Sequence, residues 1–272
     1  MCRGLFDSFA LHRCLILITK SSKIRMKLVQ CVILNGVIFL GSIWLFSYVI
    51  SPILGYILRW ILVPAGVDGV VGVISVWIEW VYYAFWILPV YILSFVLNTL
   101  WYQDIATESM RIYPVSVSVP ASSSSVTVRI ADVLYRLIFN ATFLVFLALM
   151  YNFRVLYLLY LSFFISFSSF EFRFGSINDK ILSIERNWVY YLFFGFPLAL
   201  IVVQFPSMVE NGLISLLFPF LLMTASIGAK PAGIVLPPMR GRFFFLWTER
   251  MRILAPVQLV TNIVAWILGR CV

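Results

Sequence analysis

The stretch SIERNWVYYLFFGFPLAL, residues 183–200, contains an abrupt change of polarity. Glu185, Arg186 and Asn187 stand side by side, and residues 188–200 after them carry no charge. A helix in water keeps its polar residues along one solvated face, whereas here the polar residues stop where the apolar run begins. Such a boundary is typical of the end of a helix whose solvent is lipid.

The composition of the whole chain indicates the same solvent. Of its 272 residues, 62% are hydrophobic and only 11% are charged, and the mean hydropathy is +1.01. This composition leaves too little polar surface to cover a water-soluble globule. Because helices satisfy their own backbone hydrogen bonds in lipid, we expect an all-α fold, a multi-pass transmembrane helical bundle.

Apolar runs that approach or exceed the roughly 20 residues needed to cross a bilayer predict about six spans. Pro89 is expected to kink or split the second span. The segment 53–63 is too short to span and contains Arg59, so we expect it to lie at the far interface. The shorter runs either cross with little tilt or penetrate only half of the membrane. The six runs are 28–50, 70–100, 133–151, 155–170, 188–205 and 212–227.

The charges divide the chain into three parts. We expect a basic cytosolic arm at 1–27, a transmembrane helical domain at 28–252, and a C-terminal apolar segment and tail at 253–272. If all six runs cross, every Lys and Arg except Arg59, Arg154 and Arg270 falls on the side of the N-terminus, which is therefore predicted to be cytosolic. The net charge of +9 predicts contact with anionic lipid on that face, and no nucleic acid is needed to explain it.

The sequence offers little for catalysis or metal binding. His12 is the single histidine, and HExxH, GxSxG and P-loop patterns do not occur. We therefore expect a non-enzymatic protein with no catalytic, cofactor-binding or metal-binding residues. Glu79 is the candidate intramembrane acid. Its neighbours Trp77 and Trp80 favour a position at the far interface, and the alternative is a carboxylate that serves an ion path or a partner.

Polar clusters stand at the expected cytosolic ends of several spans. Successive helical residues point about 100° apart, so Glu185 and Arg186 cannot pair well with each other. We hypothesise that Glu185 pairs with Arg173 and Arg186 with Glu171, which would clamp two spans at the headgroup boundary while Trp188 fixes the depth. The alternative is that these four charges are solvated span ends. The clusters are TLWYQDIATE (99–108), FEFRF (170–174) and SIERNW (183–188).

Nine segments carry a family resemblance. They are QCVILNG (30–36), WIE (77–79), ILPVYILS (87–94), WYQDIA (101–106), IADVL (130–134), FEFRF (170–174), IERNWVYYLFFGFPLAL (184–200), LLFP (216–219) and GAKPAG (228–233). Together they resemble the etoposide-induced, autophagy-associated transmembrane protein family of the endoplasmic reticulum, whose distant bacterial relatives are the sulfate permeases of the cysteine pathway. The family-motif residues are Trp101, Gln103, Asp104, Glu171, Arg173, Glu185, Arg186, Asn187 and Trp188.

The resemblance implies a function. The protein would be a multi-pass component of the endoplasmic reticulum membrane that supports autophagosome maturation and the degradation of autophagic cargo, in contact with membrane or cytosolic proteins of that pathway. The resemblance to permeases implies an alternative, an anion (sulfate-like) permease or channel formed by a homo-oligomer with half-penetrating helices. The internal Pro89, Pro197 and Pro219 suit that architecture and six ordinary spans equally well.

Overall fold

The computed structural model describes residues 2–62, 64, 68–113, 126–174, 177–227 and 252–271, and nearly all of them lie in helices. The predicted all-α, multi-pass fold is confirmed. Three of the described helical segments are long and apolar enough to cross a membrane: Ser22–Ile61, Val71–Ile112 and Ser207–Ile227. The motif GAKPAG (228–233) lies outside the described residues.

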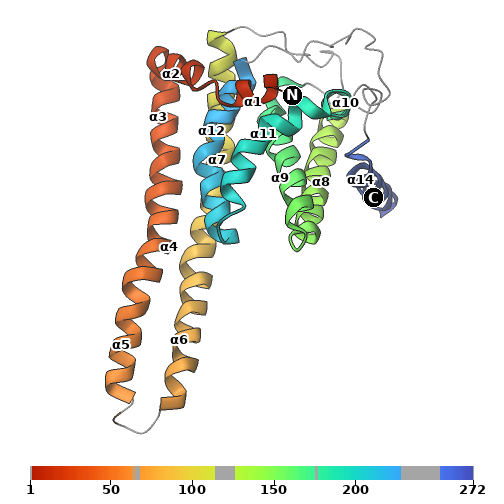
Figure 1. Ribbon diagram of the computed structural model, residues 1–272. Coiled ribbons are helices and arrows are strands. Elements are labelled where there is room, and N and C mark those ends of the chain that lie inside the picture. The colour runs from red at the N-terminus through yellow and green to blue at the C-terminus, as the bar shows by residue number, and fades with distance from the viewer. Residues whose placement is uncertain are drawn as a thin grey trace.

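Two long helices form a hairpin that runs the full height of the molecule (Figure 1). Their apolar segments contain 40 and 42 residues, which corresponds to about 60 Å each and about twice a bilayer core. The segment 53–63, which we expected at the far interface, is not a separate piece, because the first helix continues without a break to Leu62. The successive elements are α3 (Ser22–Cys31), η1 (Val32–Leu40), α4 (Gly41–Leu45), η2 (Phe46–Ile50) and α5 (Ser51–Leu62), then α6 (Asp68–Tyr82), η3 (Tyr83–Ile87) and α7 (Leu88–Ile112).

Wide helical turns precede the prolines of this hairpin. The π-helical elements η2 and η3 end at Ile50 and Ile87, two residues before Pro52 and Pro89. A proline donates no backbone hydrogen bond and its ring clashes with the preceding turn, and a π turn supplies the extra room. The second helix is therefore continuous through Pro89, so of the expected kink or split the split does not occur.

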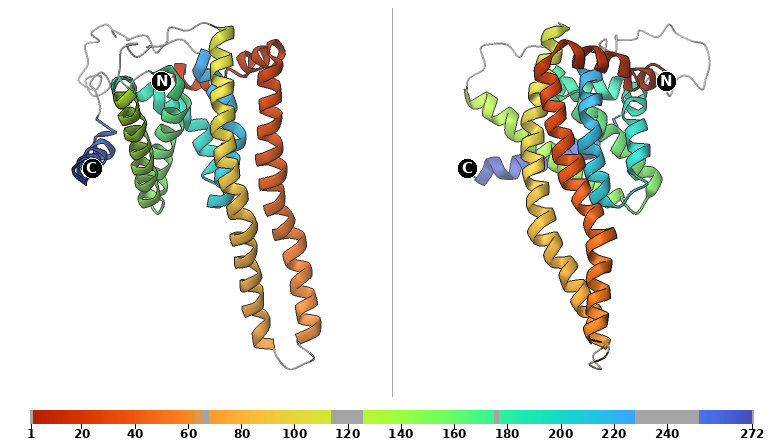
Figure 2. Two further views of the ribbon diagram at one scale, coloured as in Figure 1. Left: turned by 180° about the vertical axis from the view of Figure 1, so that it is seen from behind. Right: turned by 90° about the vertical axis from the view of Figure 1, so that its left-hand side faces the viewer.

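The other helices are shorter and form a bundle beside one half of the hairpin, in which α12 contacts both long helices. They are α8 (Val126–Met150), α9 (Arg154–Ser169), α11 (Trp188–Val202), α12 (Ser207–Ile227) and α14 (Ala255–Cys271). Helices α9 and α11 contain 16 and 15 residues, or about 23 Å, which is less than a bilayer core of about 30 Å. The other half of the hairpin projects beyond this bundle in every view (Figures 1 and 2).

Several chain segments expected on the same side of the membrane meet at one end of the molecule. Helices α1 (Cys2–Ser8) and α2 (Leu11–Lys20) lie across this end, where α3 begins and α7 ends (Figure 1). The end of α9, the helix α10 (Ile177–Arg186), the start of α11 and the end of α12 lie there too. The described ends of these segments therefore lie close together in the fold.

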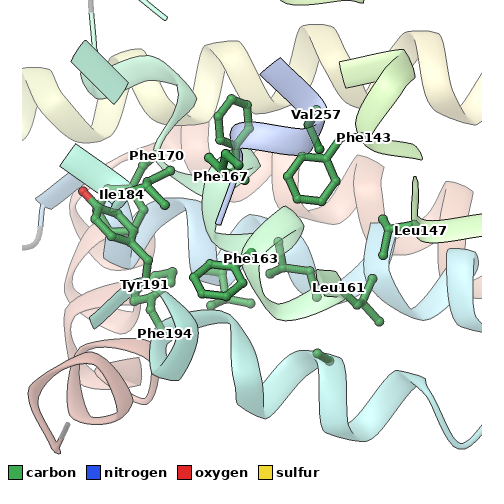
Figure 3. Close-up of a cluster of buried hydrophobic side chains, with 14 of the residues drawn as sticks. Phe143, Leu147, Leu161, Phe163, Phe167, Phe170, Ile184, Tyr191, Phe194 and Val257 are labelled. Atoms are coloured by element: carbon green, nitrogen blue, oxygen red, sulfur yellow. The ribbon is translucent and has the colours of Figure 1, made fainter. Parts of the chain in front are cut away.

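The closest helix contact in the bundle joins α9 to α11. A Cβ atom on Gly195 would collide with the backbone carbonyl of Ser162 and would lie 2.7 Å from Ser166 Oγ. The Ser166 hydroxyl donates to the backbone oxygen of Tyr191 at 2.5 Å. Small residues at such positions let two helix backbones approach, which is how membrane helices gain packing energy. Around this contact lie buried side chains that include Phe163, Phe167, Phe170, Ile184, Tyr191 and Phe194 (Figure 3).

We predict that Gly195→Ala destabilises the protein, because the added methyl group forces α9 and α11 apart. Gly55 and Gly72 provide matched controls, since a Cβ atom on either would meet nothing within 4 Å. The detergent melting temperature should fall for Gly195→Ala and should stay level or rise slightly for Gly55→Ala and Gly72→Ala. An unchanged melting temperature for Gly195→Ala would show that the α9–α11 contact is not tight.

Candidate functional site

Two residues of the predicted motifs, Glu171 and Arg173, lie at the end of the bundle in a charged cap whose other members are Asp7, Arg136 and Lys180. Glu171 belongs to the short 3-10 helix η4 (Glu171–Arg173), directly after α9. Its carboxylate accepts a 2.8 Å hydrogen bond from Arg136 Nη1 on α8 and contacts the Lys180 ammonium on α10. One carboxylate therefore joins three separate elements.

Lys180 is fully buried, and its position follows from the sequence of α10. Ile177, Lys180, Ile181 and Ile184 are spaced by three and four residues, so they share one face of the helix, and all four are buried. The Lys180 ammonium lies 3.3 Å from the ring centroid of Phe167, a cation–π contact. The charge therefore faces an aromatic ring and a carboxylate inside the protein.

The structure corrects one of the two hypothesised pairs of the clamp, and the Glu185–Arg173 pair stays a prediction. The expected Arg186–Glu171 pair is wrong, because Glu171 is held by Arg136 and Lys180 while Arg186 is exposed. Arg173 is buried and donates to the backbone oxygen of Ala225 on α12 at 3.0 Å. Glu185 is fully buried as well, so the reading of these charges as solvated span ends holds for Arg186 alone.

Asn187 and Trp188 mark the junction between α10 and α11. The Asn187 backbone N–H donates to Ser183 O at 3.0 Å, and its side chain donates to the same oxygen at 3.1 Å. Trp188 begins α11 and packs against the main hydrophobic core. The polar triplet of the opening stretch is therefore a helix end, followed at once by a new apolar helix.

The N-terminal arm contributes to the same end of the bundle. The Tyr190 hydroxyl on α11 donates to Asp7 Oδ2 at 3.0 Å, and Arg13 lies 3.7 Å from the other carboxylate oxygen of Asp7. Gly4 on α1 lies directly on the Tyr190 carbonyl, where a side chain would collide. The arm is thus docked onto the bundle along the described part of its length.

Asp104 joins the two long helices near the same end. Its carboxylate lies 3.2 Å from the Lys23 ammonium and 3.1 Å from the Lys27 ammonium, both on α3. All three side chains are partly exposed, so the energy of each pair is small. Gln103 beside it is exposed and Trp101 is half-buried.

Glu79 lies far from these residues. It is exposed on α6, in the half of the hairpin that projects beyond the bundle. Trp77 and Trp80 next to it are 67% and 68% exposed. The structure therefore separates Glu79 from the charged cap.

The electrostatics of the cap reflect its burial. Burial lowers the pKa of the Lys180 ammonium to about 8, even though the Glu171 carboxylate lies beside it. For Glu171, burial opposes the charged form, but Lys180 and Arg136 outweigh it and lower the pKa below its usual range. Burial also lowers the pKa of Arg173. In the cap, the charged forms of Glu171 and Lys180 therefore stabilise each other against the cost of burial.

The chemistry of the cap is that of a structural junction. Its acids and bases contact protein groups, and Lys180 has no exposed surface. Among the described residues, no group of three or more His, Cys, Asp and Glu side chains is placed to hold a metal ion. Sequence reasoning missed Arg136 and Lys180. The isoleucine spacing of α10 is a signal that would have placed Lys180 on the buried face.

Comparisons with known proteins agree with this picture. A curated protein of Arabidopsis thaliana named Protein EI24 homolog is 26% identical, and the match covers 87% of this chain and 85% of that protein. A protein of the same name from Dictyostelium discoideum is 29% identical, and the match covers 85% of this chain and 74% of that protein. No family model and no solved structure matches the chain.

The fold and the charged cap define a multi-pass α-helical membrane protein with a long projecting hairpin. Over most of its length the chain is similar to two proteins named Protein EI24 homolog. These relatives support the resemblance to the EI24 family that the motifs around IERNW indicated.

We predict that Glu171→Gln lowers the free energy of unfolding by about 3 kcal/mol, because it leaves the Lys180 charge buried without its carboxylate. Adding Lys180→Met should restore much of the loss, since a buried pair replaced by apolar groups costs little. Arg186→Met is the control and should cost less than about 1 kcal/mol, because Arg186 is exposed. Unfolding in mild detergent measures all three. Losses that simply add in the double variant would contradict the coupling.

We predict that Lys180 makes the stability of the folded protein depend on pH. Its folded pKa of about 8 lies below the ordinary value, so above pH 8 the folded protein releases this proton before the unfolded chain does. Stability of the wild type relative to Lys180→Met should therefore rise as pH rises from about 8 to about 10. Detergent melting temperatures of both proteins over that range test this. Parallel curves would refute it.

Proposed function

We propose that this protein is a multi-pass component of the endoplasmic reticulum membrane, with a cytosolic N-terminus, that supports autophagosome maturation and the degradation of autophagic cargo. The observation that carries the proposal is the match to two EI24 homologues over most of the chain, together with the family motifs. The autophagy role and the location come from that family resemblance.

The orientation rests on charge. The basic residues of the arm, together with the exposed Arg111 at the end of α7, would face anionic cytosolic lipid. Lys23 and Lys27 on α3 lie at this end, and Asp104 offsets only part of their charge. The projecting half of the hairpin, with Glu79, would lie toward the opposite side.

A non-enzymatic role fits the charged cap. Arg136, Glu171 and Lys180 are engaged with one another, and Arg173 with a backbone carbonyl, so their polar atoms serve packing. The protein would then act through surfaces that bind membrane or cytosolic proteins of the autophagy pathway, as one copy or as a homo-oligomer.

The alternative is an anion permease or channel. The short α9 and α11, each below the length of a bilayer core, favour it because half-penetrating helices place their ends within the membrane, where a helix N-terminus attracts anions. This function predicts solute flux from the purified protein alone.

The autophagy role is tested by removing the protein from its own cells. We expect autophagic cargo to accumulate in immature autophagosomes while secretory traffic proceeds, and re-expression of the wild type should restore turnover. Gly195→Leu, which cannot pack α9 against α11, should not restore it. Normal cargo turnover after clean removal would count against the role, and sulfate flux into liposomes that contain the purified protein would favour the permease.

A further inference from the structure

An apolar groove lies in the projecting half of the long hairpin, apart from the charged cap. Its volume is about 480 Å³. One wall is a single face of α6, because its lining residues there are spaced by three and four positions. The facing wall is supplied by Phe46 of η2. The lining residues are Phe46, Ile74, Trp77, Ile78, Val81 and Tyr82.

One side of the groove is held in place by specific contacts. The rings of Phe46 and Tyr82 are stacked, with centroids 3.7 Å apart and planes 2° from parallel. The Tyr82 hydroxyl donates to the backbone oxygen of Ser42 at 2.7 Å, across to the first long helix. Tyr82 carries the only hydroxyl among the lining residues, and that hydroxyl is therefore engaged already.

The groove lies at one end of an uncharged interval of the hairpin. Residues 80–103 of the second long helix carry no charge between Glu79 and Asp104. Such a segment is about 36 Å long, close to the thickness of a bilayer core. Trp77 and Trp80 at the Glu79 end are largely exposed, as in an aromatic belt. The groove therefore opens at the depth where phospholipid chains approach their headgroups.

We propose that this groove holds one hydrocarbon chain of a bilayer phospholipid. The apolar walls offer a hydrocarbon chain dispersion contacts on several sides, and a chain that fills the groove removes their apolar surface from water. The Tyr82 hydroxyl already donates its proton to Ser42, so a ligand carbonyl in the groove would not receive it. The fixed Phe46–Tyr82 wall means that binding requires little ordering of the protein. This site does not depend on the autophagy role.

A matched pair of valines tests the proposal. Val81 and Val76 both lie on α6 and both are 53% exposed, but only Val81 lines the groove. Val81→Trp places an indole in the groove, whereas Val76→Trp places the same group elsewhere on the helix. Native mass spectrometry of the full chain, extracted in mild detergent, measures the ratio of phospholipid-bound to free protein.

We expect one retained phospholipid in the wild type and in Val76→Trp, and a ratio about tenfold lower in Val81→Trp. The proposal is overturned if Val81→Trp retains as much phospholipid as the wild type, or if Val76→Trp loses as much as Val81→Trp. It is also overturned if the wild type carries no phospholipid or carries a sterol in its place. The detergent melting temperature shows whether Val81→Trp is folded. If it is not, Ile74→Phe fills the same groove and replaces it in the comparison.

Discussion

The packing at the end of the bundle depends on the ion pairs of the Glu171 carboxylate, because two cations from different helices bind to it. Arg136 brings α8 to this carboxylate and Lys180 brings α10. A buried lysine is costly unless a carboxylate lies within reach, so α10 can place its isoleucine face in the core only with Glu171 in this position. The same turn carries Arg173, which fixes the end of α12 through the Ala225 carbonyl.

The long hairpin is held by a second set of buried polar contacts. The Asn35 side chain donates to Asn98 Oδ1 at 3.0 Å, and Asn98 donates back to Asn35 Oδ1 at 3.0 Å. The Ser94 hydroxyl donates to the same Asn35 oxygen at 2.5 Å. A shift of either helix by one residue would break this reciprocal pair inside an apolar environment, where unpaired amides are costly. At the end of the hairpin, Glu108 accepts from the hydroxyl of Ser21, the residue that caps α3.

These two sets of contacts lie in the same half of the molecule, and the projecting half has no comparable network among its described residues. Its helices meet through the Phe46–Tyr82 stack and the bond from Tyr82 to Ser42. Exposed aromatic side chains cover much of its surface, including Tyr48, Trp60 and Trp77. Such a surface is stable only in contact with hydrocarbon or protein. The bundle half is thus ordered by internal polar contacts, and the projecting half depends on its surroundings.

Much of the fold can be predicted from the sequence, because the long apolar runs and the uneven distribution of charge can be read directly along the chain. The partner of Glu171 does not follow, since Arg136 and Lys180 reach it from other elements and only the packed bundle brings them together. Arg186 does not reach Glu171 because successive helical residues point in different directions. The face of α10 that buries Ile184 and Glu185 leaves Arg186 exposed. The continuity of 53–63 with the first span was not predicted either. The short apolar run with Arg59 suggested a separate piece, but the wide turn before Pro52 lets the first helix continue to Leu62.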